Sequence, residues 1–389
     1  MSGHATFFVI LWITLREVFP EWHGSFVQSL TRIIGAANVL VVVTAIVGLW
    51  LLPASDRPVA APPARAAERS TPQPTGPAVE EAAQPPGVVA TPEFARQVKA
   101  NELGLVPVLM YHRLVAKRRS SIDRTPAQFR QELEKLARKG YVPISAKEFA
   151  AGDIRVPAGK FPVVLTFDDG HPSHFAFDAG GGPARDTAVG ILLDVAGRHP
   201  GFRPVATFWV NHTPFGLRTE REQAAAVRWL TGNGFEVANH TWSHPDLRSL
   251  PVKNVRKQIA RLDRMLARLG ADPVTTMALP YGSMPRAKKA ARQGSWNGTR
   301  YDFDGVFLAG AEPSVSPYAK DFDRGAIQRI QSNGKKGECR KWCSQYWLEW
   351  LDKHPGKRYV SDGDPERVSV PRRLRGNIEA KRRPQVNAY

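Results

Sequence analysis

Cysteine is scarce in this sequence, which limits what its thiols can build. Only two cysteines occur among the 389 residues, Cys339 and Cys343 in the stretch "CRKWC". Two thiols do not complete a four-ligand structural zinc site, so such a site would need further ligands close in space. The pair is half of a metal site, a short disulfide or two unrelated thiols. We expect a disulfide if the region lies outside the cytoplasm, because an oxidising compartment permits one.

Acidic residues are too few to balance the basic ones. The chain has 54 Lys and Arg against 36 Asp and Glu, a formal charge of +18, which indicates contact with something anionic. Nucleic acid, lipid headgroups and an acidic polymer are all anionic, but the chain contains no nucleic-acid-binding motif, and we expect no nucleic-acid partner. Part of the excess lies in residues 371–384, "PRRLRGNIEAKRRP", which we interpret as a solvated, partly disordered tail.

Charged residues are absent from residues 33–52, "IIGAANVLVVVTAIVGLWLL". A helix of that length spans a hydrocarbon core of ~30 Å. The alternatives are a buried core helix, which would have a polar face, and a cleaved signal peptide, whose apolar run is shorter at roughly 7–15 residues. We expect a single-pass anchor in the cytoplasmic membrane, with the following domain in the periplasm or outside the cell. The flanking charges are nearly balanced and do not set this orientation.

Composition also divides the rest of the chain. From Pro53 to about Pro92 the sequence is dense in Pro and Ala, cannot bury a core and reads as an extended tether. Alternating apolar and helical patterns begin near Leu105. The expected organisation is an N-terminal cytoplasmic segment (1–32), a transmembrane anchor (33–52), a Pro/Ala-rich linker (53–104), a globular domain (105–371) and a basic tail (372–389).

Within the globular part, short apolar runs alternate with amphipathic patterns, which predicts an α/β fold. Helices are predicted at residues 125–140, with Thr and Pro at the start and Gly at the end, and at residues 251–270. Buried strands are predicted at residues 106–112, 161–167, 204–210, 235–239 and 274–279.

Polar residues follow these predicted strands. His112 ends the first strand, the pair Asp168 and Asp169 the second, His240 the fourth, and Pro280 with Tyr281 the fifth. Polar groups at the carboxyl ends of several strands are typical of an α/β barrel. A doubly wound open sheet would also place a site there, but the barrel better explains why so many strands contribute.

Two histidines and two aspartates among these residues have the chemistry of a metal site. "HTWSH" places His240 and His244 four residues apart, and imidazole with a carboxylate is a common ligand set for zinc or a similar divalent metal. Successive side chains at a strand end point in different directions. One of Asp168 and Asp169 can therefore bind the ion while the other deprotonates a water nucleophile.

The same motifs resemble those of the polysaccharide deacetylase family, also called NodB-homology or carbohydrate esterase family 4 proteins. The matching stretches are "TFDDG" (166–170), "ATFWV" (206–210) and "HTWSHP" (240–245). "PVLMYHRL" (107–114) and "LPYG" (279–282) are similar to the subgroup that deacetylates poly-β-1,6-N-acetylglucosamine. The resemblance covers roughly residues 105–371 and implies a distorted (β/α) barrel.

By matching position, the resemblance implies Asp168 as general base and Asp169, His240 and His244 as metal ligands. Zinc is the expected metal, with iron, cobalt or nickel as alternatives. Pro280 and Tyr281 match a third motif, in which the backbone N–H of Tyr281 would help to hold the oxyanion. The implied reaction is hydrolysis of an N-acetyl amide on a sugar polymer.

Two features of the family pattern are missing. The third motif, here "TMALPYG", lacks the arginine that orients the base in many members, and Arg324 or Arg329 are the substitutes that we consider. The late Leu-x-His that supplies the general acid is also absent. His171 is our candidate acid, and His112 either acts at the site or hydrogen-bonds to a metal ligand.

The expected function is therefore that of a metal-dependent N-deacetylase outside the cytoplasm. Its substrate would be a cell-envelope or exopolysaccharide that contains N-acetylhexosamine, and exopolysaccharide synthesis or export machinery would be its partner. We expect His112, Pro280 and Trp242 to contact substrate, while Trp209 is expected in the core. The alternatives are a catalytically degenerate carbohydrate-binding or assembly protein and an amidase on a non-sugar amide.

Overall fold

The computed structural model describes residues 89–389. The expected N-terminal segment, the anchor at residues 33–52 and most of the linker lie outside the described residues. Within residues 89–389, no helix has both the length and the apolar character needed to cross a bilayer. The end of the expected linker belongs to the folded unit, because helix α3 (Pro92–Gln97) buries Ala95 against it.

The centre of the fold is an eight-stranded sheet in which every pairing is parallel. Its order is β10-β1-β3-β4-β5-β6-β9, with β2 paired to β3. The sheet curls into a half-barrel, which confirms the predicted α/β class with parallel strands. The strands are β1 (Val108–Tyr111), β2 (Tyr141–Ile144), β3 (Phe161–Phe167), β4 (Thr207–Val210), β5 (Glu236–Asn239), β6 (Thr276–Ala278), β9 (Gly305–Phe307) and β10 (Ile330–Gln331).

The two edges of this path are linked by the segment that leads into β10. The N–H of Val306, in β9, donates to the carbonyl of Arg324 at 2.8 Å, and the N–H of Leu308 donates to the carbonyl of Ile327 at 2.8 Å. Further along the same segment, β10 pairs with β1 at the opposite edge. Residues 324–331 therefore connect β9 to β1, and a residue in this segment lies between both edges.

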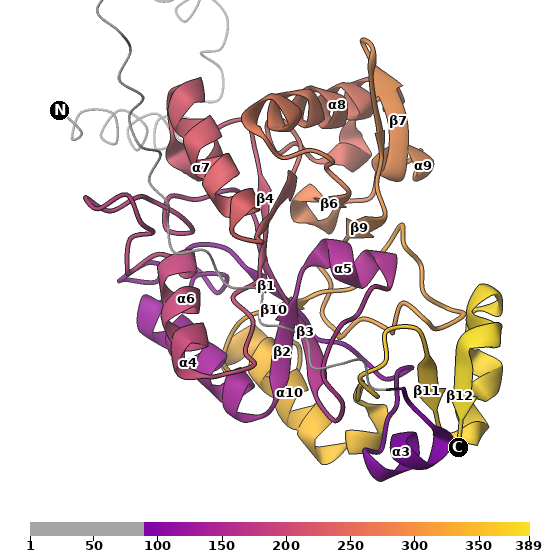
Figure 1. The fold of residues 1–389 in the computed structure, drawn as a ribbon. Coiled ribbons are helices and arrows are strands. Elements are labelled where there is room, and N and C mark those ends of the chain that lie inside the picture. The colour runs from indigo at the N-terminus through magenta and orange to yellow at the C-terminus, as the bar shows by residue number, and fades with distance from the viewer. Residues whose placement is uncertain (1–88) are drawn as a thin grey trace, which may run out of the picture. The chain divides into compact units, whose positions relative to one another are not determined.

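Helices surround the strands (Figure 1). The predicted helix at 125–140 is α4, which begins with a capping box between Thr125 and Gln128 and buries Phe129 and Leu133. The predicted helix at 251–270 is α8, which ends at Gly270 in the left-handed conformation. The helices are α4 (Pro126–Arg138), α5 (Ala146–Ala151), α6 (Ala188–Arg198), α7 (Glu220–Gly232), α8 (Val252–Leu269), α9 (Lys289–Arg292) and α10 (Ser344–Lys353).

Short elements complete the described chain. Strands β7 (Gln293–Trp296) and β8 (Thr299–Asp302) form an antiparallel hairpin, and β11 (Val368–Val370) pairs in parallel with β12 (Val386–Ala388). The 3-10 helices are η1 (Pro214–Gly216), η2 (Leu247–Ser249), η3 (Pro280–Gly282), η4 (Gly337–Arg340), η5 (Pro355–Lys357), η6 (Arg372–Asn377) and η7 (Ala380–Gln385).

The strands are apolar on both faces because hydrophobic side chains pack against each face of the sheet. All residues of β1 are buried, and so are all but the first of β3. Tyr111 of β1 stacks on Phe167 of β3 with ring centroids 5.0 Å apart, and Phe129 of α4 meets the edge of Tyr111 at 5.0 Å. Helix side chains thus cover one face of the strands, while Trp209 is fully buried in a second cluster on the other face, as predicted.

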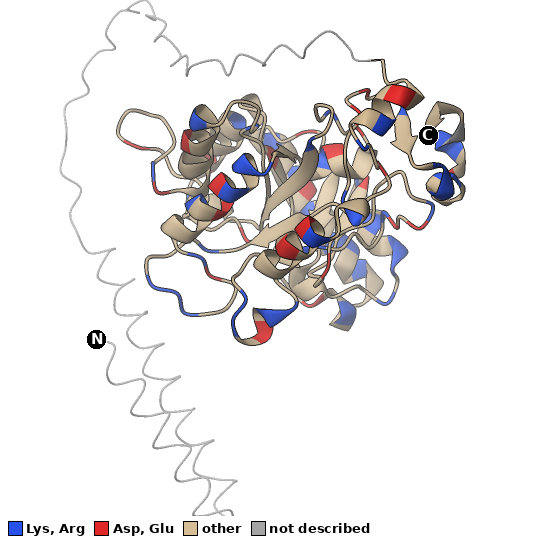
Figure 2. Cartoon of the chain, turned by 90° about the horizontal axis from the view of Figure 1, so that it is seen from below, with Lys and Arg blue, Asp and Glu red and all other residues tan. Residues whose placement is uncertain are grey.

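The basic C-terminal segment is not the disordered tail that the charge pattern predicts. It contains η6, η7 and β12, and Ile378 is fully buried. The Asn387 side chain donates to the carbonyl of Ala90 and to the Ser369 hydroxyl, both at 3.1 Å. Interspersed apolar residues anchor the segment, which a count of charges overlooks. Figure 2 shows Lys and Arg on these short helices and on many other elements, so the positive charge is not confined to the C-terminal segment.

Candidate metal centre

Carboxyl ends of the parallel strands bring the predicted site residues together. Asp168 and Asp169 follow β3, His240 follows β5, and His112 follows β1. Non-glycine residues adopt positive φ at Asp169 (74°), Thr241 (67°), His244 (55°) and Tyr281 (58°). Each non-glycine residue in this left-handed conformation costs on the order of 1–3 kcal/mol, and such residues cluster at functional sites. Four of the seven non-glycine residues with positive φ in the described part of the chain therefore lie in or beside the motifs.

Three of these side chains form a compact set of metal donors. The Oδ1 atom of Asp169 lies 3.5 Å from Nε2 of His240 and 3.4 Å from Nε2 of His244. One ligand atom from each of the three residues lies within 4.8 Å of the other two. Two imidazoles and one carboxylate are a common protein ligand set of catalytic zinc, which leaves a position open for water or substrate.

The orientation of His240 supports this interpretation. Its Nδ1 hydrogen-bonds to the carbonyl of Ala278 at 2.8 Å, so Nδ1 carries the proton and the Nε2 lone pair is free. Nε2 is buried and has no hydrogen-bond partner among the described residues. An unpaired buried polar atom is costly, and a bound cation would satisfy it. The three residues therefore fit a divalent metal ion, and the geometry is shared by zinc and related metals.

The other carboxylate of the pair, Asp168, is held by a buried arginine. Nη1 and Nη2 of Arg329 each donate to one carboxylate oxygen of Asp168 at 2.7 Å. Burial alone would raise the pKa of Asp168, but the Arg329 guanidinium and the nearby His240 outweigh it and hold that pKa well below its usual range. Asp168 is therefore an anion with a fixed orientation.

Arg329 thus takes the place of the arginine that the third motif lacks. Its side chain is fully buried, its Nε donates to the carbonyl of Leu308 at 2.6 Å, and its guanidinium lies 5.0 Å from the Trp209 ring centroid. Of the two arginines considered from the sequence, this is the one that pairs with Asp168. The side chain of Arg324 makes no ion pair among the described residues.

His112, rather than His171, lies beside Asp168. Nε2 of His112 is 3.9 Å from Oδ2 of Asp168, and burial lowers the pKa of His112 although Asp168 and Asp169 oppose that shift. The His171 ring instead contacts Ser173, whose hydroxyl lies 2.9 Å from Nδ1 and whose N–H donates to it at 3.1 Å. His171 forms no ion pair with either aspartate in the described part of the chain, and its assignment as the acid stays a prediction.

Comparisons with known proteins agree with this site. A family model described as polysaccharide deacetylase matches residues 155–295, which include both aspartates and the two histidines of the candidate metal site. A chitooligosaccharide deacetylase of Bradyrhizobium sp. (strain ANU 289) is 30% identical over 196 residues, which are 50% of this chain and 72% of that protein. The chain belongs to the polysaccharide deacetylase family.

Two other matches are partial. The peptidoglycan-N-acetylmuramic acid deacetylase PdaC of Bacillus subtilis (strain 168) is 33% identical over 122 residues, 31% of this chain, and the chain spans only 22% of its length. The structure of IcaB from Ammonifex degensii aligns with a TM-score of 0.43 and 20% identity, over 61% of this chain and 94% of that one.

In this polysaccharide deacetylase family member, the two aromatic residues expected at the site, Tyr281 and Trp242, differ in how far protein groups cover their rings. The Tyr281 side chain is 71% exposed, and its ring meets the edge of His244 with centroids 4.5 Å apart, beside the candidate metal site. Pro280, which precedes it, is buried. The Trp242 ring stacks on His212 at 5.1 Å and lies 3.6 Å from the guanidinium of Arg261. Tyr281 is therefore free to contact a ligand, whereas the Trp242 ring is already engaged by protein groups.

Proposed function

We propose that this chain is a metal-dependent hydrolase that removes N-acetyl groups from a polysaccharide containing N-acetylhexosamine. The observation that carries the proposal is the arrangement of the two adjacent aspartates. Asp169 faces His240 and His244, while Asp168 is fixed as an anion by Arg329 next to them. This separation of one metal-binding and one proton-accepting carboxylate suits amide hydrolysis by water.

The residues have distinct roles in the proposed reaction. A divalent metal held by Asp169, His240 and His244 would polarise the acetyl carbonyl and acidify the attacking water. Asp168 accepts a proton from that water as the new C–O bond forms. The N–H of Tyr281 stabilises negative charge on the acetyl oxygen. When the C–N bond breaks, the nitrogen takes a proton, and the products are acetate and a free amine.

His112 is the group best placed to supply the proton to the leaving nitrogen. Its Nε2 faces Asp168 at 3.9 Å, and its Nδ1 is buried without a partner among the described residues. This position stands in for the absent Leu-x-His. His112 therefore serves the acid role for which the sequence analysis names His171.

The substrate and the compartment belong to the same proposal. One relative is a chitooligosaccharide deacetylase and another a peptidoglycan deacetylase, which favours a β-linked N-acetylhexosamine polymer such as poly-N-acetylglucosamine. The disulfide between Cys339 and Cys343 favours an oxidising compartment. We propose a domain outside the cytoplasm, tethered by residues 33–52 and working beside exopolysaccharide synthesis or export machinery.

The test is deacetylation of a panel of N-acetylated oligosaccharides with linkage varied and metal content controlled. We expect acetate release and a matching mass loss with at least one N-acetylglucosamine oligomer. Asp168→Asn should abolish release while the bound metal remains. If no oligomer releases acetate with any divalent metal, the enzyme proposal is wrong, and the carbohydrate-binding alternative on a degenerate scaffold takes its place.

A non-sugar amide as the substrate remains the other alternative, because the same residues would hydrolyse any accessible acetamide. Simple N-acetylated amines and acetylated peptides in the same panel separate the two cases. Turnover of these compounds at a rate equal to that of the oligosaccharides would contradict a polysaccharide substrate.

A further inference from the structure

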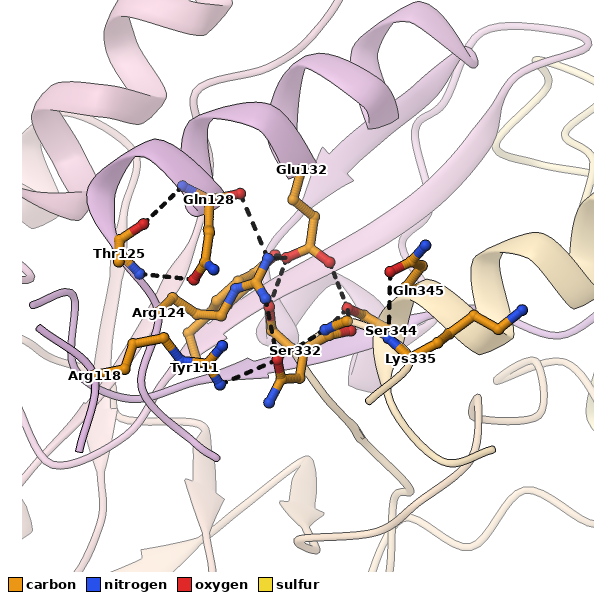
Figure 3. Close-up of polar contacts among 12 residues, drawn as sticks. Tyr111, Arg118, Arg124, Thr125, Gln128, Glu132, Ser332, Lys335, Ser344 and Gln345 are labelled. Carbon is orange, nitrogen blue, oxygen red and sulfur yellow. Dashed lines mark hydrogen bonds and ion pairs between the residues drawn. The ribbon is translucent and has the colours of Figure 1, made fainter. Parts of the chain in front are cut away.

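A buried carboxylate outside the metal centre gathers three hydroxyl groups. Glu132 lies on the face of α4 that packs on the sheet, and its Oε2 accepts hydrogen bonds from the Tyr111 hydroxyl at 2.9 Å and the Ser332 hydroxyl at 2.6 Å. Its Oε1 accepts from the Ser344 hydroxyl, and Nη2 of Arg124 lies 3.8 Å from Oε2. Figure 3 shows these side chains converging on Glu132 from four parts of the chain.

Asn333 extends this set of contacts. Its Oδ1 accepts from Nη2 of Arg118 at 3.2 Å and Nη1 of Arg124 at 3.4 Å, and its Nδ2 donates to the carbonyl of Ser121 at 2.6 Å. Its backbone N–H donates to the Ser344 hydroxyl at 3.1 Å. Each of these side chains has at least one partner, which restricts its movement, although Nε of Arg118 and Nε of Arg124 are unpaired among the described residues.

The partners of Glu132 lie next to two residues of the metal centre. Tyr111 is the last residue of β1 and directly precedes His112, while Ser332 follows β10 and is the third residue after Arg329. The two strands are neighbours, and the N–H of Ser332 donates to the carbonyl of Met110 at 2.9 Å. One carboxylate therefore ties together the ends of the strands that present His112 and Arg329 to Asp168.

Strand β10 needs such support. It is two residues long and lies at the end of the sheet path, so ladder hydrogen bonds alone hold it weakly. Arg329, which precedes it, must keep both guanidinium hydrogen bonds to Asp168 at 2.7 Å. A small displacement of this strand would misalign the base, and misplacement of a reacting group by about 1 Å costs up to about 100-fold in rate.

We propose that Glu132 is a positioning residue for the hydrolysis. Through Tyr111 and Ser332 it fixes β1 and β10 relative to each other, and thereby places His112 and Arg329 around Asp168. Glu132 itself contacts neither substrate nor metal. The inference rests on the proposed function for its kinetic consequence, but the structural link between the strands does not depend on it.

The principal test variant is Tyr111→Phe, which removes one hydroxyl and keeps the packed ring. A matched control exists elsewhere in the domain, where the Tyr359 hydroxyl donates to the buried Glu102 at 3.0 Å. No partner of Glu102 adjoins a residue of the metal centre in the chain. We expect Tyr111→Phe to lower kcat about tenfold with KM unchanged, and Tyr359→Phe to change neither. Equal kcat values for the two variants would overturn the proposal.

A double-mutant cycle distinguishes positioning from a general loss of stability. In an Arg329→Lys background the bidentate contact with Asp168 is already lost, and only the placement of His112 can still be affected. Adding Tyr111→Phe or Ser332→Ala should therefore lower kcat by clearly less than the roughly tenfold expected in the wild-type background. A full tenfold loss in that background would contradict positioning through Arg329. Ser332→Ala serves as a second single variant that removes a different hydrogen bond to the same carboxylate.

Hydrogen exchange provides a measurement that needs no activity. We expect amides of residues 329–333 and 109–112 to exchange about tenfold faster in Tyr111→Phe than in wild type, with no such change in Tyr359→Phe. Faster exchange in a protein that deacetylates no substrate would refute the proposed function but support the role of Glu132 in fixing β1 and β10 relative to each other. Unchanged exchange in both segments would refute that role, whatever the activity.

Discussion

Replacement of Arg329 by methionine is the sharpest test of how the Asp168 carboxylate is held. The guanidinium and the Asp168 carboxylate are both buried and share two hydrogen bonds of 2.7 Å. Methionine has a similar length and no charge, so Arg329→Met leaves the carboxylate in place without its cation. The nearest other nitrogen atoms of this site, Nε2 of His112 and of His240, are each 3.9 Å from Oδ2, too far for a hydrogen bond.

The expected loss of stability follows from the burial of the Arg329–Asp168 ion pair. Removing one partner of a buried ion pair costs about 3–5 kcal/mol, because the remaining charge is left without compensation. We therefore expect the free energy of unfolding of Arg329→Met to fall by about 3–5 kcal/mol at neutral pH. Removing the charge from both partners, in Arg329→Met with Asp168→Asn, should recover part of that loss, since no unpaired buried charge remains.

Urea unfolding of the wild type, both single variants and the double variant measures these differences. The control is Arg155→Met, which removes an ion pair with Asp153 whose side chains are 47% and 50% exposed, and should cost below about 1 kcal/mol. A loss in Arg329→Met no larger than in this control would refute the reasoning. A double variant less stable than Arg329→Met would also contradict it, because the cost would then not come from the orphaned carboxylate.

Three further predictions concern the ligands, the acid and a buried carboxyl group. His244→Ala should weaken metal binding by more than about 100-fold, measured by competition with a chromogenic chelator; unchanged affinity would exclude His244 as a ligand. His112→Gln should lower kcat by about 100-fold or more and by more than His171→Gln does, in steady-state assays; the reverse order would restore His171 as the acid. Burial raises the pKa of Asp263 to about 7, above its ordinary value, so the native state holds the proton more tightly and stability falls as pH rises toward that value. Asp263→Asn should therefore gain about 2–3 kcal/mol relative to wild type between about pH 5 and about pH 8 in urea unfolding, and a constant difference would show that Asp263 keeps an ordinary pKa.

Local sequence patterns predicted the interior of the fold well, because the strands are buried on both faces. Predicted strands at 106–112, 161–167, 204–210 and 235–239 correspond to β1, β3, β4 and β5. The short elements β2, β9 and β10 were not predicted. A strand of two residues such as β10 has no periodicity to detect, and its pairing with β1 is set by tertiary contacts.

The three residues of the candidate metal site were predicted from their motifs, whereas the buried groups that surround the site could not be assigned from the sequence. His240 and His244 lie in one short motif, but Arg329 is distant from Asp168 in the chain and was one of two arginines considered. A signal for Glu132 was present, because it lies three residues after Phe129 and one before Leu133 on the apolar face of the predicted helix. An acidic residue at a core-facing position of an amphipathic helix indicates a buried hydrogen-bond network.

The position of Arg329 has a consequence for how the family motif should be interpreted. A cation that orients the Asp168 carboxylate is recognised by its geometry and not by its position in the sequence. In this chain the cation comes from the segment that joins β9 to β1, so its placement depends on how the two ends of the sheet meet. The arginine missing from the third motif therefore does not by itself indicate a degenerate site, because Arg329, the residue before β10, supplies the contact with Asp168.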